Sequence, residues 1–245
     1  MVSRKWICMI KVAIVAALER EIRPLVKNWR LVEREHEGKR FKFLEDGSKV
    51  VLVCGGIGPQ AARRATEAVI ALYQPGIVQS VGFAGALEPA LRVGDILSPA
   101  RVIDAGDGSS VIIDSGSGVL LTFTSIVTVG QKAKLAEAYG AQAIDMEASA
   151  VAKSARCHRV HFAVTKVISD EFDFAMPAMD RFVSSDGQFH SGRFLGFVGV
   201  RPWLWAKVIR LARRSHKAAR TLCHELHRQG MQLERTAELD SSLRV

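Results

Sequence analysis

Residues 11–18 read KVAIVAAL, and Glu19, Arg20 and Glu21 follow them directly. A short apolar run that is rich in Val, Ile and Ala and lacks a polar alternation is typical of a strand buried on both faces. Residues 49–54 (KVVLVC) show the same pattern. Between these runs and their counterparts downstream, apolar side chains recur at helical spacing. The pattern therefore predicts strands that alternate with helices.

The alternation continues through most of the chain. Further strand-like runs occupy residues 77–82, 126–129, 143–146 and 162–168, and helical patterns occupy residues 59–72, 131–139 and 147–156. This order predicts a single three-layer α/β domain over residues 1–200, with a central mostly parallel or mixed sheet flanked by helices. Residues 171–200 are irregular and fit a lid or a flexible connection. Residues 201–245 are expected to form a basic amphipathic helix and a polar tail packed on the same domain.

Composition narrows the classes of protein. The chain has 245 residues, four cysteines and a formal net charge of +9. The cysteines show neither CxxC spacing nor a Cys/His ligand pattern, so neither a disulfide framework nor a metal site is expected. Arg4 and Lys5 precede an apolar stretch in the manner of a signal peptide, but Lys11 interrupts it. We expect a leader followed by a buried strand, no membrane-spanning segment and a cytoplasmic location.

The positive charge is concentrated near the C-terminus. Residues 201–228 carry Arg201, Lys207, Arg210, Arg213, Arg214, Lys217, Arg220 and Arg228 against the single acid Glu225. Such a helix suits peripheral contact with an anionic membrane or binding to nucleic acid. Aromatic residues interleaved with charge are not enough for base stacking, so nucleic acid is the less favoured partner. A binding module without catalysis is the alternative class of function.

The loops that follow the strands carry the candidate chemistry. Ligands of open α/β sheets bind at the carboxyl ends of the strands. Glu21, Glu147 and Asp170 each follow a strand-like run, and glycine-containing turns occupy residues 55–58 and 82–85. The first of these turns lacks the full G-x-G-x-x-G fingerprint and its acidic partner, so a dinucleotide cofactor is not expected.

Six short motifs occur along the chain in a single order. They are Ala17-Leu18-Glu19-Arg20-Glu21, Gly56-Ile57-Gly58, Gly82-Phe83-Ala84-Gly85, Val93-Gly94-Asp95-Ile96, Asp145-Met146-Glu147-Ala148 and Ile168-Ser169-Asp170. In order and approximate spacing they resemble the purine nucleoside phosphorylase and nucleosidase superfamily, and within it the methylthioadenosine/S-adenosylhomocysteine nucleosidases. The resemblance implies cleavage of the N-glycosidic bond of a purine nucleoside, a homodimer or larger assembly, and neither an organic cofactor nor a metal.

The chemistry of that cleavage gives the carboxylates distinct roles. The transition state resembles an oxocarbenium ion, so the departing base needs a proton and the sugar needs a nucleophile on its other face. Asp170 is the candidate general acid, and the resemblance implies that it acts at purine N7. The resemblance places Glu147 on the ribose hydroxyls and Met146 against the sugar. Ordinary alternatives are a helix N-cap for Asp170 and a helix-dipole interaction for Glu147.

Glu21 distinguishes hydrolysis from phosphorolysis. In the phosphorylase branch the loop after the first strand supplies an Arg that binds phosphate, whereas Glu21 stands where the nucleosidases activate water. Residues 79–81 (QSV) offer no second Arg. Hydrolysis is therefore favoured, although Arg20 or Arg23 within reach of phosphate keeps phosphorolysis open, and Glu21 as a solvated helix acid is the ordinary alternative. The expected substrate-binding set also includes Gly56, Ile57, Gly58, Ala84, Gly85 and Ser169.

Three departures from the nucleosidases limit the substrate assignment. Gly55 replaces their usual Ser, Lys166 replaces their Arg, and residues 104–131 are shorter and lack the Phe-containing loop that stacks on adenine. The short middle and residues 201–205 (RPWLW) are more similar to the hopanoid-associated branch, which acts on adenosylhopane. The expected substrate is a 5′-substituted adenosine such as methylthioadenosine, S-adenosylhomocysteine or adenosylhopane. Aromatic residues that could line a path for an apolar 5′ group, or simply pack, are Phe172, Phe174, Phe194, Phe197, Trp203 and Trp205.

Overall fold

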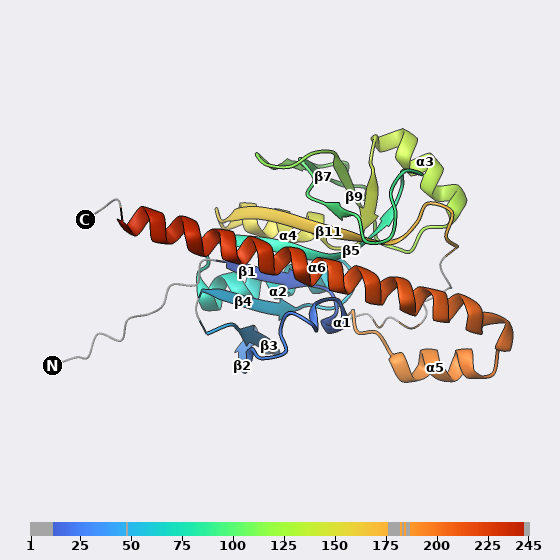
Figure 1. The fold of residues 1–245 in the computed structure, drawn as a ribbon, viewed down its shortest axis with the longest axis horizontal. Coiled ribbons are helices and arrows are strands. Elements are labelled where there is room, and N and C mark those ends of the chain that lie inside the picture. Colours follow the sequence, from blue (N-terminus) through green and yellow to red (C-terminus); the bar gives the residue numbers. More distant parts are fainter. Residues whose placement is uncertain (1–11, 48, 176–181, 183, 185–186, 243–245) are drawn as a thin grey trace.

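A computed structural model describes residues 12–47, 49–175, 182, 184 and 187–242 of the chain (Figure 1). The expected leader, residues 1–11, lies outside the described residues. The strands are β1 (Val12–Ala16), β2 (Arg30–His36), β3 (Lys39–Glu45), β4 (Val50–Cys54), β5 (Ile77–Ala86), β6 (Ile96–Leu97), β7 (Arg101–Asp104), β8 (Ser110–Ile112), β9 (Val119–Thr122), β10 (Ala143–Asp145) and β11 (His161–Asp170). The helices are α1 (Glu19–Ile22), α2 (Pro59–Tyr73), α3 (Val129–Tyr139), α4 (Ala148–Cys157), α5 (Ser191–Gly199) and α6 (Pro202–Ser242).

The described strands form one mixed sheet with β5 at its centre. Its main order is β2-β3-β4-β1-β5-β10-β9-β7-β8, and β11 pairs with both β5 and β6. β1 and β11 run parallel to β5, whereas β10 runs antiparallel to it along Gly85 and Ala86. The carboxyl ends of β1 and β11 therefore meet beside the second half of β5, where β10 also arrives. The expected α/β fold class, with its mixed sheet and long C-terminal helix, is confirmed.

Helices cover both faces of the central strands (Figure 1). α2 and α4 pack against each other on one face, and their small side chains fill a core with β1, β4 and β5. α1 and α6 lie on the other face. There Leu222 of α6 is fully buried and packs in one cluster with Ile14 and Val167. Truncation of a leucine in such a position to alanine costs roughly 2–5 kcal/mol, so this part of α6 belongs to the core.

Two parts of the sheet differ from the sequence prediction. The strand expected at residues 126–129 is wrong, because residues 126–128 form a loop that leads into α3. The strand of that region is β9. Val127 in the loop is buried, and a short apolar run does not by itself distinguish a buried loop from a buried strand. The β2–β3 hairpin was not predicted, since its charged residues mask the alternation.

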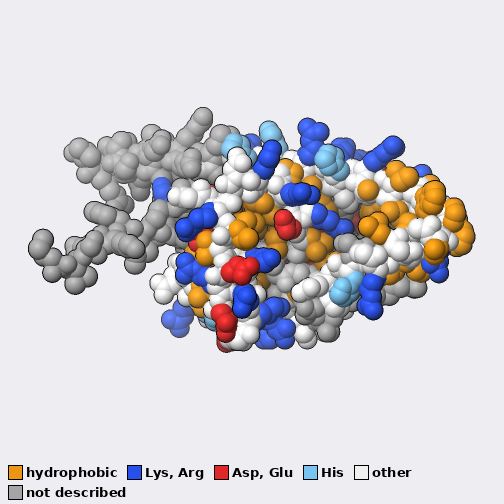
Figure 2. All heavy atoms as spheres, turned by 90° about the horizontal axis from the view of Figure 1, so that it is seen from below, with side chains coloured by type: hydrophobic (Ala, Val, Ile, Leu, Met, Phe, Trp, Pro, Cys, Tyr) orange, Lys and Arg blue, Asp and Glu red, His pale blue; other side chains and the backbone are white. Residues whose placement is uncertain are grey.

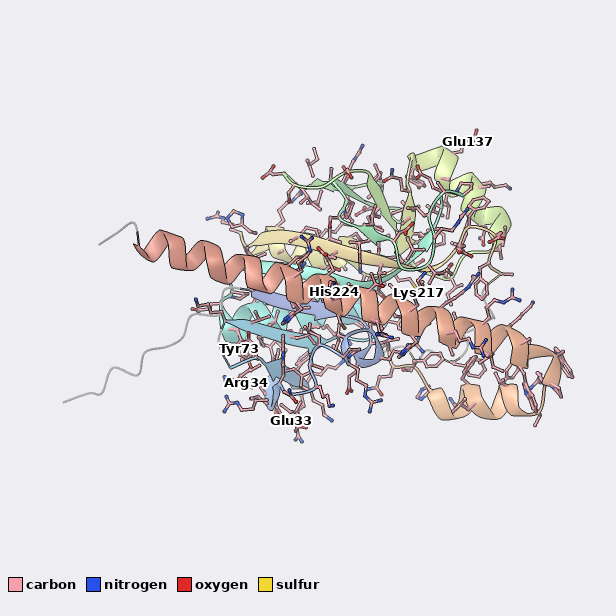
Figure 3. All side chains as sticks on the ribbon, in the orientation of Figure 1. Glu33, Arg34, Tyr73, Glu137, Lys217 and His224 are labelled. Carbon is pink, nitrogen blue, oxygen red and sulfur yellow. The ribbon has the colours of Figure 1, made fainter. Side chains whose placement is uncertain are left out.

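The β2–β3 hairpin turns through two residues with positive φ, Glu37 at 49° and Gly38 at 72°. This is the backbone conformation that a two-residue hairpin requires for its twist to match the strands. On this edge of the sheet the guanidinium of Arg34 lies 4.9 Å from the ring centroid of Tyr73, and both residues are labelled in Figure 3. The hairpin lies at the edge of the sheet, separated from the central strands by β4.

The C-terminal region contains two helices. α6 extends from Pro202 to Ser242, beyond the expected polar end, and crosses the sheet as a single helix on which Lys217 and His224 are labelled in Figure 3. The stretch expected to be irregular contains α5, which forms a helical hairpin with the start of α6. Within the described residues, no helix combines the length and the hydrophobicity that a membrane crossing requires.

Candidate functional site

A cavity of about 170 Å³ opens where β1, β10 and β11 end beside β5. Its wall is formed by residues 83–85, 125–127, 144–147 and 169–170 together with Ala17, Leu18, Arg20, Glu21, Ile57, Lys132 and Phe189. The three carboxylates singled out in the sequence, Glu21, Glu147 and Asp170, all line this one cavity. Segments more than a hundred residues apart in the chain thus supply one group of acids.

A bulge in β11 orients Asp170. β11 and β5 are in register up to Ile168 and Ala84, but the next partner of Gly85 is Asp170, so Ser169 is an extra residue. Such bulges re-aim the side chain that follows, often beside active sites. The Ser169 hydroxyl donates a hydrogen bond to Asp170 Oδ1 at 2.9 Å. No helix follows Asp170 directly, which removes the alternative that this residue is a helix N-cap.

Lys132 is a site residue that the sequence did not reveal. It projects from α3, is 2% exposed, and places its Nζ 2.6 Å from Asp170 Oδ2. The same ammonium donates to the backbone oxygen of Glu171 at 2.8 Å. Two of its three N–H groups are thereby assigned, and the side chain still lines the cavity. A buried ion pair thus lies where the general acid was expected.

Glu21 is buried, which rules out the ordinary alternative that it is a solvated acid in the first turn of a helix. Its exposed fraction is 5%, and burial raises its pKa from 4.5 to about 7 against the opposing effects of Lys166 and Arg20. A carboxyl group with a pKa near neutrality is suited to take a proton from water. Gly82 makes room for it: a Cβ atom on Gly82 would lie 2.9 Å from Glu21 Oε2, and the φ of Gly82 is +145°.

Glu147 enters the cavity from the loop between β10 and α4. Its Oε1 accepts a hydrogen bond of 2.8 Å from the backbone N–H of Gly58, and burial together with Asp145 raises its pKa to about 7. The amide of Ala148 in the first turn of α4 donates instead to Asp145 Oδ2 at 2.9 Å. Because Asp145 accepts the hydrogen bond from the N-terminal turn of α4, the Glu147 carboxyl group does not have to cap the helix and lines the cavity.

Lys166 lies behind the carboxylates. It is 1% exposed, and its Nζ lies 2.9 Å from Asp145 Oδ2. Burial alone would lower the pKa of Lys166, but Asp145, Glu147 and Glu21 hold it above its usual value. The resemblance to the nucleosidases implies an Arg at residue 166, and here the Lys166 ammonium pairs directly with Asp145 and partly offsets the charge of the nearby acids. A charge balanced in this way keeps the buried carboxylates compatible with the fold.

Two glycines of β5 leave room for Glu21 and Asp170. Just as Gly82 faces Glu21, a Cβ atom on Gly85 would lie 2.9 Å from Asp170 Oδ2. Glu21 thus lies against one position of β5 and Asp170 against another, and both line the same cavity. Two carboxyl groups in one cavity can serve a water on one side of a bond under attack and a leaving group on the other.

Replacement of Gly85 by alanine is expected to lower kcat about 10- to 100-fold. The added methyl group meets the Asp170 carboxylate at 2.9 Å and displaces it, and a shift of about 1 Å in a catalytic group costs up to about a hundredfold. Steady-state rates and thermal melts test this. Gly130→Ala is the matched control, because a Cβ atom there meets nothing within 4 Å. Equal rates for Gly85→Ala and the wild type would contradict the assigned geometry.

The remaining expected substrate-binding residues divide into two groups. Met146, Ile57, Ala84, Gly85 and Ser169 line the cavity. Gly56 and Gly58 do not: a Cβ atom on Gly56 would collide with the backbone oxygen of Gly187, and Gly58 acts through its N–H on Glu147. The sequence missed Lys132, Phe189 and the apolar loop of residues 125–127. In the described part of the chain, no three His, Cys, Asp or Glu side chains lie together as metal ligands would.

The family model of the phosphorylase superfamily matches residues 11–126 and 113–185. The chain belongs to the phosphorylase superfamily. The predicted family is thereby confirmed. The predicted enzyme class, an enzyme that cleaves N-glycosidic bonds, is confirmed by this match together with the relatives described next. The match covers the segments that supply Glu21, Glu147 and Asp170.

Curated relatives in this superfamily include two bacterial nucleosidases. The 5′-methylthioadenosine/S-adenosylhomocysteine nucleosidase of Staphylococcus carnosus (strain TM300) is 24% identical, over 65% of this chain and 86% of the relative. The enzyme of the same name from Staphylococcus aureus (strain bovine RF122 / ET3-1) is 27% identical over the same shares.

Solved structures share the fold at lower identity. The native futalosine hydrolase of Helicobacter pylori strain 26695 superposes with a TM-score of 0.67 at 18% identity, covering 89% of this chain and 96% of that chain. The 5′-methylthioadenosine/S-adenosylhomocysteine nucleosidase of Neisseria meningitidis, in complex with methylthio-immucillin-A, gives a TM-score of 0.63 at 18% identity, covering 87% and 95%.

Proposed function

We propose that the enzyme hydrolyses the N-glycosidic bond of a 5′-substituted adenosine and releases adenine. The observation that carries this proposal is the pair of buried carboxyl groups that line one cavity, Glu21 packed against Gly82 and Asp170 packed against Gly85. An acid on the leaving-group side and a base on the water side are what an oxocarbenium-like transition state requires. The names of the curated relatives support the same reaction class.

In this mechanism each side of the cavity has its own proton transfer. The Lys132–Asp170 pair holds a proton that Asp170 donates to N7 as the ribosyl–purine bond breaks, so the base leaves uncharged. Glu147 binds the ribose hydroxyls and Met146 packs against the sugar. Glu21 takes a proton from the water whose oxygen forms the new bond to the anomeric carbon. Glu21 then loses that proton to solvent, and the Lys132–Asp170 pair regains one.

Charge on the water side favours hydrolysis over phosphorolysis. A phosphate nucleophile carries nearly two negative charges and needs a surplus of cations. On this side Glu21 and Glu147 are two acids, and the ammonium of Lys166 is already engaged with Asp145. Arg20 lines the cavity, but its guanidinium lies over the ring of Phe189 at 5.4 Å. Phosphorolysis therefore requires Arg20 to leave Phe189.

The 5′ substituent is proposed to extend toward Phe189. This ring lines the cavity and lies 5.6 Å, between ring centroids, from Phe194 of α5, so the wall continues into an aromatic cluster. An apolar wall of this kind suits a methylthio group and also a larger hydrocarbon such as that of adenosylhopane. Of the aromatic residues expected along such a path, Phe194 and Phe197 belong to the cluster, while Trp203 and Trp205 lie on the exterior.

Release of free base tests the proposal directly. Adenosine, methylthioadenosine, S-adenosylhomocysteine, inosine and adenosylhopane are each incubated with the enzyme, with and without phosphate, and the base is quantified by chromatography. Adenine release at equal rates in both conditions, with a 5′-substituted substrate preferred, is the expected result. Release that requires phosphate would replace hydrolysis by phosphorolysis, and no release from any substrate would favour a binding module. Light scattering on the same sample tests the proposed homodimer, and cell fractionation tests the proposed cytoplasmic location.

The rate is expected to depend on pH through Glu21. As a base it acts only when ionised, and its pKa is about 7. kcat/KM should therefore fall about tenfold per pH unit below this value and level off above it. The measurement is a pH–rate profile between about pH 5 and 9. A profile without an acidic limb near neutrality would remove Glu21 from the role of base.

Glu21→Gln is expected to increase stability at alkaline pH while removing water activation. Because burial raises the folded-state pKa of Glu21 from 4.5 to about 7, the folded protein retains a proton that the unfolded chain has lost in this window. The contribution of Glu21 to stability is thus present below about pH 4.5 and is lost as pH rises through about 7. The melting temperature of the variant should exceed that of the wild type at pH 8 and match it at pH 5. A lower value at pH 8 would contradict the burial argument.

A further inference from the structure

Large hydrophobic side chains are exposed together at one end of the molecule. Of the seven such residues in the described part of the chain, five lie between residues 195 and 209. We call them the hairpin tip: Leu195, Val200, Trp203, Trp205 and Ile209. Trp203 and Val200 are each 71% exposed. Figure 2 shows hydrophobic side chains gathered at the end of the molecule where the α5–α6 hairpin projects. Apolar residues clustered on a surface mark a site of interaction.

The α5–α6 hairpin is held together by contacts of its own. Its inner side is an aromatic cluster in which Phe182 contacts Phe194 and Phe197 at ring-centroid distances of 5.4 and 5.3 Å. The indole Nε1 of Trp205 donates to the backbone oxygen of Val198 at 3.1 Å, which ties α6 to the end of α5. The hairpin therefore has its own packed interior, and the tip residues are exposed on its outer side.

Among the described residues, the two helices of the hairpin carry cations and no acid near the tip. Between residues 187 and 224 the chain carries Arg193, Arg201, Lys207, Arg210, Arg213, Arg214, Lys217 and Arg220, and it contains no Asp or Glu. Arg193, Lys207 and Arg210 are exposed on the same two helices as the tip. Basic side chains also flank the hydrophobic end in Figure 2. An apolar tip with Trp residues and a basic surround matches the interface of an anionic bilayer, where tryptophan rings sit at headgroup level and Lys and Arg bind lipid phosphates.

The same charges disfavour other binding partners for the hairpin tip. A second copy that docked through this face would bring two sets of cations together. Nucleic acid would use the basic residues, but it offers no apolar phase for Leu195, Val200 and Ile209. We propose that the α5–α6 hairpin docks on the surface of an anionic lipid bilayer, with the hairpin tip inserted at the interface. Since Phe189 joins the cavity wall to Phe194 on α5, a docked hairpin holds the cavity mouth close to the lipid.

Vesicle co-sedimentation tests the docking independently of catalysis. The full chain is mixed with phosphatidylcholine vesicles, with or without phosphatidylglycerol. We expect binding to the anionic vesicles, weakening as salt is raised. Arg193→Gln/Lys207→Gln/Arg210→Gln should weaken binding about fivefold per charge. Leu195→Gln/Trp203→Gln should weaken it at least about tenfold and reduce quenching of the remaining tryptophan fluorescence by brominated lipid.

Two matched controls carry similar changes elsewhere. Ile112→Gln replaces a side chain that is 78% exposed on β8, and Arg40→Gln removes an exposed charge on β3. Both should bind vesicles like the wild type, and circular dichroism melts confirm that each variant folds. The proposal is overturned if the wild type does not bind anionic vesicles or if the tip variants bind equally well. It is also overturned if the protein binds duplex DNA in place of vesicles, or if tip variants dissociate an oligomer.

Discussion

Asp170→Asn is expected to leave less than about one thousandth of the wild-type kcat while the protein remains folded. A positioned general acid contributes about 10²–10⁴-fold, and the amide cannot donate an acidic proton to the departing base. Asparagine keeps the shape of the side chain, so the hydrogen bond from the Ser169 hydroxyl can persist. Single-turnover release of adenine measures the chemical step, and circular dichroism monitors the fold.

Asp107→Asn is the matched control for this substitution. Asp107 also pairs with a lysine, since its Oδ2 lies 2.8 Å from Lys153 Nζ, but it lies on the surface and outside the cavity. Its replacement should leave kcat unchanged. Wild-type rates in Asp170→Asn would show that Asp170 is not the general acid. Lys132 would then be the proton donor on the leaving-group side of the cavity.

The sequence was sufficient to predict the strands that carry the site and the acids at their ends. Residues 11–18, 49–54 and 162–168 are apolar because both faces of the central strands are covered by helices, so their pattern was clear. Glu21 and Asp170 follow such runs directly. Glycines at 82 and 85 were recognised as a motif, but only the structure shows that each leaves room for one carboxylate.

Lys132 was beyond the reach of sequence reasoning. It follows Gln131 and precedes Ala133 and Lys134 on α3, a pattern typical of a solvated helix face. Its burial depends on how α3 packs over the end of β11, which is a contact across 38 residues of chain. The extra residue in β11 at Ser169 was equally hidden, because a bulge is defined by the partner strand and has no local signature here. Long-range packing, rather than propensity, decided both features.

Lys132→Met is expected to lower kcat by about 100-fold or more with little change in KM. Methionine fills a similar volume but removes the ammonium that lies 2.6 Å from Asp170 Oδ2 and supplies the acid side with its proton. Loss of one partner also leaves the other charge buried and unpaired, which costs about 3–5 kcal/mol in comparable pairs. Kinetics and thermal melts are measured together. Lys134→Met on the same helix is the control, because Lys134 is exposed.

A double-mutant cycle separates a positioning role of Lys132 from a structural one. If Lys132 acts through Asp170, then Lys132→Met/Asp170→Asn should be no slower than Asp170→Asn alone, because the proton route is already lost. The double variant should also melt at a higher temperature than Lys132→Met, since the uncompensated carboxylate is gone. Lys132→Arg, which retains a cation, should restore part of the rate. Additive losses in kcat, with no rescue by arginine, would show that Lys132 supports only the packing of α3 on β11, and the acid would then be Asp170 by itself.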